Sequence, residues 1–391
     1  GGFWFWDPVE NVSLMPWLTL TALLHCIVVL ERRAALTSWA VILSITTFSL
    51  SMCGTFLVRS GILNSVHTFA NDPARGIFIL IFLFVLIVLS LGIFFLFHKE
   101  NIKDKNNFFW LSKETSILMN NWFMMYFLSV VLIGTVYPIF LDVISSEKIS
   151  VGPPFYQKLI VPFLIPFLIF MSLGPKLKWI KSKIENKKSL IIIFIISVML
   201  AFFIIRVLTT ELLFFTLLVS AAFFLFFTTL KELFIKKFND ISQTLAHLGF
   251  SLLILSILFN SILSSEVITN IKVGEKFSYS KGEIFFKKTE EIKESNFNSI
   301  IAYFEIKDKS GKIIKLNPEI RIYNQPIIIT SEADIKTTLL EDKFLVMNLV
   351  KGKEYFNIRY QVKPFMIWIW ISVSLLSLGG LMSLLKKRYE K

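Results

Sequence analysis

Cysteine and charged residues are scarce in this sequence of 391 residues, and each shortage narrows the possible functions. The two cysteines, Cys26 and Cys53, lie in apolar runs without Cys-x-x-Cys or zinc-type spacing, so we interpret both as buried small hydrophobic residues. Charged residues make up 18%, and the Lys and Arg residues behind the net charge of +13 fall mostly in short segments between apolar runs. Because they form no basic patch interleaved with aromatic residues, the sequence excludes a nucleic-acid-binding protein.

Hydrophobic residues, by contrast, reach 54%, aromatic residues 15%, and the mean hydropathy is +0.66. Apolar runs of about 20 residues recur along most of the chain, which is the length that an α-helix needs to cross a bilayer. The composition therefore predicts a polytopic α-helical membrane protein. The nine predicted spans are roughly 14–30, 36–58, 75–97, 116–142, 159–175, 189–207, 210–230, 243–263 and 364–385.

Positive charge alternates along the connectors between these spans. Clusters of Lys or Arg follow the first, third, fifth, seventh and ninth spans, whereas the other short connectors carry few. Because Lys and Arg are enriched in cytoplasmic loops, this alternation predicts a cytoplasmic C-terminus and an external N-terminal segment. The basic clusters are Arg32 and Arg33; Lys99, Lys103, Lys105 and Lys113; Lys176, Lys178, Lys181, Lys183, Lys187 and Lys188; Lys231, Lys236 and Lys237; and Lys386, Lys387, Arg388 and Lys391.

One long connector differs from the others. It contains short runs in which polar and apolar residues alternate, such as 300–306 and 355–360, and a turn at 308–311. This pattern predicts a small β-rich domain, which the charge alternation places outside. The predicted organisation is an external aromatic stretch over 1–13, a helix bundle over 14–263 with an external loop at 59–74, the β-rich domain over 264–363, and a last span with a cytoplasmic tail over 364–391.

The aromatic stretch at the N-terminus reads GGFWFWDPVEN and is followed by Met15-Pro16-Trp17-Leu18. One interpretation is an interfacial aromatic belt that leads into a helix, with Asp7 as N-cap, Pro8 at the first helical position and Glu10 completing a capping box. The other is a platform for a flat ligand. The two interpretations are compatible. Because the chain begins within this motif and without Met, we expect it to be the C-terminal part of a longer protein.

Two of the four histidines lie inside predicted spans at similar depth. His25 precedes Arg32 by seven residues, which places it roughly 10 Å from the cytoplasmic end of its helix. His247 follows Lys237 by ten residues in a helix that enters from the same side. Imidazoles from two helices at one level can ligate a haem iron axially. The alternative, which depth alone leaves open, is that each histidine forms a hydrogen bond between helices.

The external loop carries a third histidine, His67, on the same side as the aromatic stretch. It is a candidate haem-iron ligand or an ordinary surface histidine. Arg59 and Arg75 flank the loop and can pair with carboxylates such as haem propionates, or simply extend from helix ends toward the membrane surface. Asp72 and Pro73 are typical of an N-cap and first helical position. We interpret His98 as an ordinary interfacial residue.

The opening GGFWFWDPVEN and MPWL closely resemble the tryptophan-rich (WWD) signature of the CcmF family of cytochrome c haem lyases. Further segments resemble the family in the same order: GTFLVRSGILNSVHTFANDPARGIF at 54–78, ISVGPPF at 149–155, AHLGFSLLI at 246–254, NPEIRIY at 317–323 and KPFMIWIWISVSLLSLGGL at 363–381. Phe3 departs from the family, which usually has Trp there. Phe keeps the ring face and loses the indole N–H donor.

The resemblance implies a haem lyase of the holocytochrome-c synthase type. Haem, as substrate, would be held on the external platform and joined by its vinyl groups to the Cys-x-x-Cys-His motif of apocytochrome c. The family pattern assigns the platform to Trp4, Trp6 and Trp17, with Asp7 beside them, and an axial ligand to His67. It assigns a permanent b-type haem to His25 and His247. The second axial ligand of the platform haem lies, in the family, before the WWD stretch.

The resemblance also implies the partners and the location. The partners are apocytochrome c, a haem chaperone, an apocytochrome-binding subunit of the lyase complex, quinol as electron source, and membrane lipid. The implied location is the bacterial inner (cytoplasmic) membrane with the WWD stretch and the β-rich domain in the periplasm, or the mitochondrial inner membrane. The rival functions are a haem or solute transporter, for which no inverted repeat is evident, and a non-catalytic assembly scaffold.

Overall fold

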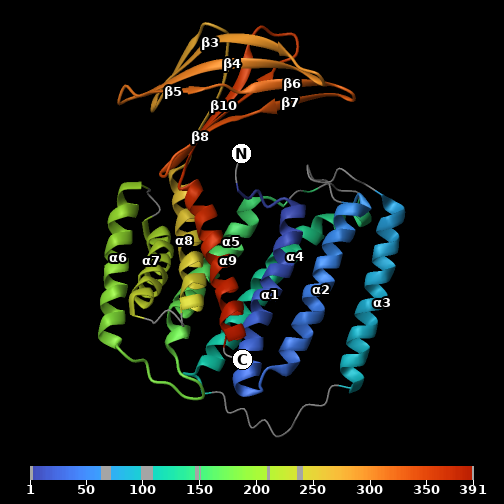
Figure 1. The fold of residues 1–391 in the computed structure, drawn as a ribbon, viewed down its shortest axis with the longest axis vertical. Coiled ribbons are helices and arrows are strands. Elements are labelled where there is room, and N and C mark those ends of the chain that lie inside the picture. The colour runs from blue at the N-terminus through green and yellow to red at the C-terminus, as the bar shows by residue number, and fades with distance from the viewer. Residues whose placement is uncertain are drawn as a thin grey trace. The chain divides into compact units, whose positions relative to one another are not determined.

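The computed structural model describes residues 3–62, 72–97, 109–145, 149, 151–208, 212–235 and 241–389. The chain divides into two compact units, residues 2–197 and 198–391, with the boundary inside helix α6. Figure 1 shows the elements of both units. The helices are α1 Pro8–Arg33, α2 Thr37–Ser60, α3 Pro73–Phe97, α4 Lys113–Ser145, α5 Pro153–Leu173, the short 3-10 helix η1 Gly174–Lys176, α6 Lys187–Leu208, α7 Leu212–Ile235, α8 Ile241–Leu263 and α9 Met366–Tyr389.

Nine helices in the described part of the chain are long and apolar enough to cross a membrane. They correspond one for one to the nine predicted spans, so the prediction of a polytopic helical membrane protein with one β-rich domain is confirmed. The structural helices mostly begin a few residues earlier than the apolar runs, because polar capping residues continue them beyond the hydrophobic core. The predicted sidedness stays a prediction.

Helix starts follow the capping chemistry of the sequence. Asp7 is the N-cap of α1, with a full capping box to Glu10 and with Pro8 in the first turn. At α3, a carboxylate oxygen of Asp72 accepts a hydrogen bond from the backbone N–H of Arg75 at 3.2 Å, as its expected N-cap role requires. The backbone N–H of Asp72 also donates to the carbonyl of Arg59 at 2.9 Å, which joins the end of α2 to the start of α3.

The first unit, residues 2–197, is built on α1. This helix packs against α2 and α4, while α2 also contacts α3 and α4 contacts α5. Side-chain hydrogen bonds join these helices, among them Thr47 to Thr19 at 2.9 Å, Asn121 to Cys26 at 3.0 Å, Asn11 to Tyr156 at 2.9 Å and Tyr126 to the Leu159 carbonyl at 3.0 Å. The pairing of Asn121 with Cys26, which is fully buried, agrees with the interpretation of Cys26 as a packing residue.

The second unit contains a β-sandwich between α8 and α9. Its antiparallel strands form a four-stranded sheet in the order β1-β10-β9-β8 and a six-stranded sheet in which β2-β3-β4-β6-β7 are neighbours and β5 pairs with β4. Their bounds are β1 Ser265–Ile271, β2 Lys276–Tyr279, β3 Gly282–Lys293, β4 Phe297–Asp308, β5 Ile313–Leu316, β6 Glu319–Asn324, β7 Ile327–Glu332, β8 Asp334–Thr337, β9 Glu341–Leu349 and β10 Phe356–Pro364.

The sandwich core follows from the alternation seen in the sequence. Phe286 and Phe304 stack at 4.3 Å between ring centroids, and the buried residues Leu345, Met347 and Ile358 belong to the same cluster from the other sheet. The predicted turn at 308–311 connects β4 to β5, with Gly311 at a φ of +86° that favours glycine. The Asp308 carboxylate accepts hydrogen bonds from Ser310 and from the backbone of Lys312, which lower the pKa of Asp308.

Helices α8 and α9 approach closely through glycines. A Cβ atom at Gly249 would lie 2.8 Å from the backbone of Ser372 and Leu376, and one at Gly379 would lie 2.6 Å from the backbone of Ala246. These two glycines therefore set the spacing of the helix pair that carries the sandwich.

Candidate functional site

Trp6 anchors the aromatic stretch to the first unit. Its ring stacks on that of Tyr156 in α5, with centroids 4.2 Å apart and an interplanar angle of 5°, and Trp4 meets Trp6 edge-on at 6.1 Å. Tyr156 is itself 1% exposed and contacts Phe155 edge-on at 5.3 Å. The stretch is thus a cluster of rings fixed on a buried base, and Phe5, at 59%, is its most exposed member.

The backbone of Trp6 lies in the left-handed region, with φ at +58°. A residue other than glycine pays about 1 kcal/mol or more for this conformation, so other contacts have to hold it. Asn11 supplies them from the second turn of α1: its Nδ2 donates to the Trp6 carbonyl at 3.2 Å and to the Tyr156 hydroxyl at 2.9 Å. Asn11 is fully buried, and its Oδ1 has no hydrogen-bond partner among the described residues.

Asp7 and Glu10 fix the direction in which the stretch enters α1. An Asp7 carboxylate oxygen accepts from the Val9 N–H at 2.9 Å, while Glu10 accepts from the backbone N–H groups of Asp7 at 3.2 Å and Phe5 at 2.8 Å. The Asp7 carboxylate is therefore engaged in the helix cap, as the first sequence interpretation states. The candidate role of Asp7 in chemistry remains a prediction beside it.

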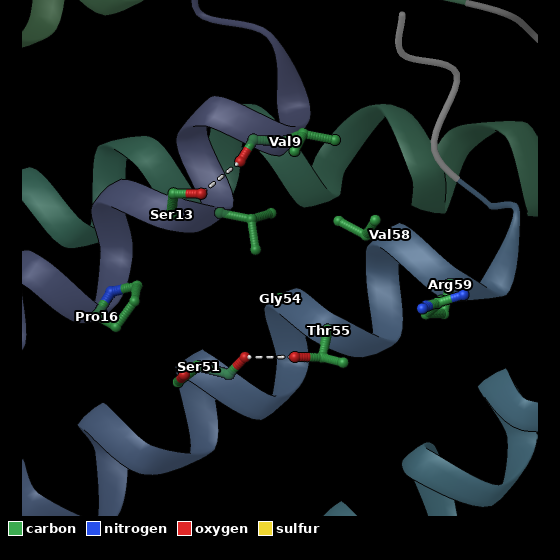
Figure 2. A pocket seen from close by; sticks show the side chains of 9 residues that line it. Val9, Ser13, Pro16, Ser51, Gly54, Thr55, Val58 and Arg59 are labelled. Atoms are coloured by element: carbon green, nitrogen blue, oxygen red, sulfur yellow. Dashed lines mark hydrogen bonds between the residues drawn. The ribbon is translucent and has the colours of Figure 1, made fainter. Parts of the chain in front are cut away.

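A pocket of about 340 Å³ lies between α1 and α2 directly after this cap. Figure 2 shows one stripe of each helix facing it. From α1 come Val9, Val12, Ser13 and Pro16, and from α2 come Ser51, Gly54, Thr55, Val58 and Arg59. Pro16 has no N–H, so the carbonyl of Val12 receives no helical hydrogen bond from it. A Cβ atom at Gly54 would meet the Val12 side chain at 2.8 Å, which shows how closely the helices approach at the pocket floor.

The two candidate arginines differ in their surroundings. Arg59 lines the pocket and makes no ion pair within the described residues. Arg75 is paired with Asp72, with Nε 3.1 Å from a carboxylate oxygen, and its side chain is 75% exposed. The sequence treats the two alike, whereas among the described residues Arg59 lies beside a pocket without an ion-pair partner and Arg75 is paired with a carboxylate.

The candidate haem ligands are spread over the chain. His25 is half-buried on α1, and its Nδ1 lies 2.8 Å from the carbonyl of Thr21. A ring N–H donated to a backbone carbonyl leaves Nε2 as the metal-binding nitrogen, which is the arrangement that orients histidine ligands. The residues around His25 therefore fit an axial ligand.

His247 belongs to the second unit, where it is half-buried on α8. Its neighbours Ala246 and Gly249 face α9. At 100° per residue, His247 lies on a different face of α8 from these two residues. His67 and His98 lie outside the described residues. Trp17, 44% exposed, lies about 13 Å along α1 from Pro8 and is not part of the ring cluster.

Sequence reasoning did not single out Tyr156 and Asn11. Tyr156 directly follows the ISVGPPF segment at 149–155, and Asn11 ends the aromatic motif, so both adjoin motifs without standing out in them. The sequence feature that could have identified Asn11 is an amide side chain at the start of an apolar helix. For Tyr156 there was none, because the contact with Trp6 spans 150 positions and local patterns do not report it.

We expect Tyr156 and Asn11 to stabilise the aromatic stretch measurably. Tyr156→Phe keeps the ring and removes the hydrogen bonds of the hydroxyl with Asn11 and Thr135, at a cost of about 1–2 kcal/mol, whereas Tyr156→Leu also removes the stack and costs about 2–4 kcal/mol. The thermal midpoint of the detergent-solubilised protein should fall in the order wild type, Tyr156→Phe, Tyr156→Leu, and the near-UV circular dichroism of the tryptophans should weaken most in the last. Equal midpoints and spectra for all three would contradict this assignment.

Two family models match the chain. One, described as a cytochrome C assembly protein, covers residues 1–63, and the other, described as a CcmF C-terminal beta-sandwich, covers residues 262–364. The first includes the aromatic stretch and the pocket, and the second coincides with the strands β1 to β10.

Curated relatives match over the whole chain. It is 34% identical over 404 residues to the cytochrome c-type biogenesis protein CcmF of Pseudomonas fluorescens, covering 100% of this chain and 61% of that protein. It is 32% identical to CcmF of Escherichia coli, covering 100% of this chain and 62% of that protein. The chain thus spans about three fifths of the length of these relatives.

A solved structure described as the cytochrome c heme lyase CcmF shares the fold. Its TM-score is 0.76 at 21% identity, over 98% of this chain and 60% of that one. At this identity the likeness concerns the fold, with its spans and its β-sandwich. Together with the sequence matches, it leads to one assignment: the chain belongs to the CcmF family of cytochrome c-type biogenesis proteins.

Proposed function

We propose that this chain forms part of a cytochrome c haem lyase, in which haem is the substrate held at the aromatic stretch and attached to apocytochrome c. The observation that carries the proposal is the ring cluster of Trp4 and Trp6 on the buried base Tyr156. Beside it lies a pocket lined by Arg59, which makes no ion pair with any residue that the structure describes. A fixed aromatic surface with an adjacent cation suits a flat, amphipathic dianion such as haem.

The proposed reaction is an addition that needs orientation more than acid–base chemistry. A thiol of the apocytochrome adds across a haem vinyl group, so that one S–C and one C–H bond form while the S–H and the vinyl π bond are lost. No net oxidation or reduction occurs in this step. Holding both partners in register converts a bimolecular addition into a positioned one, an effect that can reach about 7–11 kcal/mol.

Each named residue has a role in that positioning. The rings of Trp4 and Trp6 contact the haem face, and Arg59 binds a propionate at the mouth of the pocket. His67 binds the iron until the histidine of the apocytochrome motif replaces it. Asp7 acts through the helix cap that fixes the stretch, and Trp17 and Arg75 form the outer limits of the site. The substrate supplies both reacting thiols, so Cys26 and Cys53 take no part.

His25 and His247 are the residues that would hold a permanent b-type haem within the spans. The hydrogen bond from the His25 ring to the carbonyl of Thr21 supports this, because it directs Nε2 outward as a ligand. A haem bound there supplies one-electron transfer, with quinol as a possible source of electrons, and keeps the substrate iron reduced. The partners that follow from the proposal are apocytochrome c, the subunit that binds it and the chaperone that delivers haem.

Transport and scaffolding remain the rival functions. A transporter would move haem without joining it to protein, and a scaffold would leave attachment independent of the aromatic stretch. A scaffold needs no fixed aromatic surface such as that of Trp6 on Tyr156, and the sequence shows no inverted repeat of the kind that marks many transporters. We therefore favour the lyase. The proposed setting is a bacterial inner membrane or a mitochondrial inner membrane with the stretch and the β-sandwich external.

The lyase proposal predicts that thioether formation depends on His67. The full-length protein, reconstituted with haem and an apocytochrome c, should yield covalent haem in the pyridine haemochrome spectrum, and His67→Ala should lower that yield about tenfold or more unless imidazole is supplied. A variant that retains normal yield without imidazole would exclude His67 as a ligand. Haem transfer without any thioether product in the wild type would favour the transporter.

The transmembrane haem is tested separately by His25→Ala and His247→Ala. Each variant should lose the absorbance of a low-spin, two-histidine b-type haem in the purified protein, because removal of one axial ligand changes the spin state and weakens retention. His98→Ala is the matched control and should keep the full spectrum. Undiminished absorbance in either single variant would show that its histidine is not an axial ligand.

The two arginines provide a further test within the site. Arg59→Gln should weaken haem retention about tenfold or more, since it removes a charge-assisted contact worth about 1.5–3 kcal/mol. Arg75→Gln should change retention about twofold at most, because an exposed ion pair already occupies this side chain. Haem titrations of both variants at equal ionic strength measure the difference, and equal affinities would contradict the assignment of Arg59.

A further inference from the structure

The loop that joins β8 to β9 is apolar and lies against the start of α9. Between β8 and β9, Leu339 and Leu340 are 66% and 68% exposed, although they are adjacent leucines in a domain with a well-formed core. Exposed large apolar side chains that lie together mark a surface that another phase or molecule covers. The question is which one covers this pair.

Hydrogen bonds tie this loop to the first turn of a membrane span. The indole Nε1 of Trp368 donates to the Leu339 carbonyl at 2.8 Å, and the backbone N–H of Phe365 donates to the Leu340 carbonyl at 2.8 Å. The span itself runs over Met366–Leu384. Leu339 and Leu340 are therefore at the depth where α9 enters the membrane, and not out on the sandwich.

The end of α8, the helix that precedes the sandwich, lies at the same membrane depth as the start of α9. The span of α8 ends at Leu263, and Asn260 within it donates to the Pro364 carbonyl at 2.6 Å. Phe259 and Phe365 contact each other with ring centroids 5.7 Å apart. The end of α8 and the start of α9 are thus held together, and the strands β1 and β10 continue from them into the sandwich (Figure 1).

Polar residues lie on one side of these strand ends and apolar residues on the other. On the β1 and β10 side is a polar pocket lined by Ser264, Ser265, Glu266, Gln361 and Lys363. On the other side is the leucine loop, with exposed Trp370 one turn into α9. Polar groups that suit lipid headgroups beside leucine and tryptophan that suit the upper acyl region are typical of a membrane interface.

We propose that the Leu339–Leu340 loop inserts into the interfacial layer of the bilayer and anchors the β-sandwich to the lipid surface. The occupant of this surface is phospholipid, because the loop is hydrogen-bonded to the start of a segment that spans the membrane. The loop, together with the chain connections to α8 and α9, gives the sandwich a third point of attachment. Such an attachment limits the tilt of the domain about the α8–α9 pair.

The experiment places a polarity-sensitive fluorophore on a cysteine at Leu340 in the full chain, in a Cys26→Ala, Cys53→Ala background reconstituted in phosphatidylcholine nanodiscs. The label should show blue-shifted emission and be quenched several-fold more by lipid spin-labelled near the headgroup than by lipid labelled near the chain end. Ile327→Cys on β7, whose side chain is 81% exposed, is the matched control and should show water-like emission with little quenching.

A second measurement avoids the cysteine background. A benzophenone amino acid at Leu339 in the otherwise native chain should form a covalent lipid adduct on illumination, detected by mass spectrometry, while the same residue at Ile327 should not. Water-like emission at Leu340 together with no lipid adduct at Leu339 would overturn the proposal. Crosslinking to another protein chain in place of lipid would overturn it as well.

Discussion

The stack of Trp6 on Tyr156 is the interaction on which the candidate site depends. Trp6 occupies a left-handed backbone conformation that costs about 1 kcal/mol or more, and an aromatic pair of this kind returns about 0.5–1.5 kcal/mol beyond its burial. The hydrogen bonds of Asn11 to both residues add about 1 kcal/mol. These terms are comparable, so the stretch keeps its geometry only while α1 and α5 keep their spacing.

The spacing of α1 and α5 depends on the hydrogen bonds that polar side chains form among the apolar helices of the first unit. Most hydroxyl groups in the spans bond to carbonyls of their own helix, as Thr21 does to Trp17, and so contribute little between helices. The few side-chain hydrogen bonds that join two different helices determine how those helices pack. At one end of the first unit, Glu114 is buried and accepts from the Ile180 N–H while paired with Arg33 at 3.0 Å. At the other end is Asn11 with Tyr156, so polar contacts clamp α1 at both ends.

Local chemistry was enough to predict the spans, the caps of α1 and α3 and the turn at 308–311, since each depends on residues within a few positions. It also gave the stretch, three of the four histidines and both arginines as candidates. It did not give the base under Trp6, because Tyr156 lies 150 positions away, nor the difference between Arg59 and Arg75. That difference arises from Asp72, which caps α3 and thereby lies within reach of Arg75.

The two interpretations of the aromatic stretch, as the entry to a helix and as a ligand platform, describe the same structure, because the helix cap also fixes the rings. A surface that orients a flat ligand needs rings whose backbone is fixed before binding, since ordering it afterwards would cost about 1–2 kcal/mol per residue. Glu10 does this for the backbone of Phe5 and Asp7, and Asn11 does it for the carbonyl of Trp6, without using the side chains of Phe5 and Trp6. Asp7 therefore acts on the platform through the helix start, and the left-handed turn at Trp6 is what lets one residue face Tyr156 while its neighbour begins a membrane span.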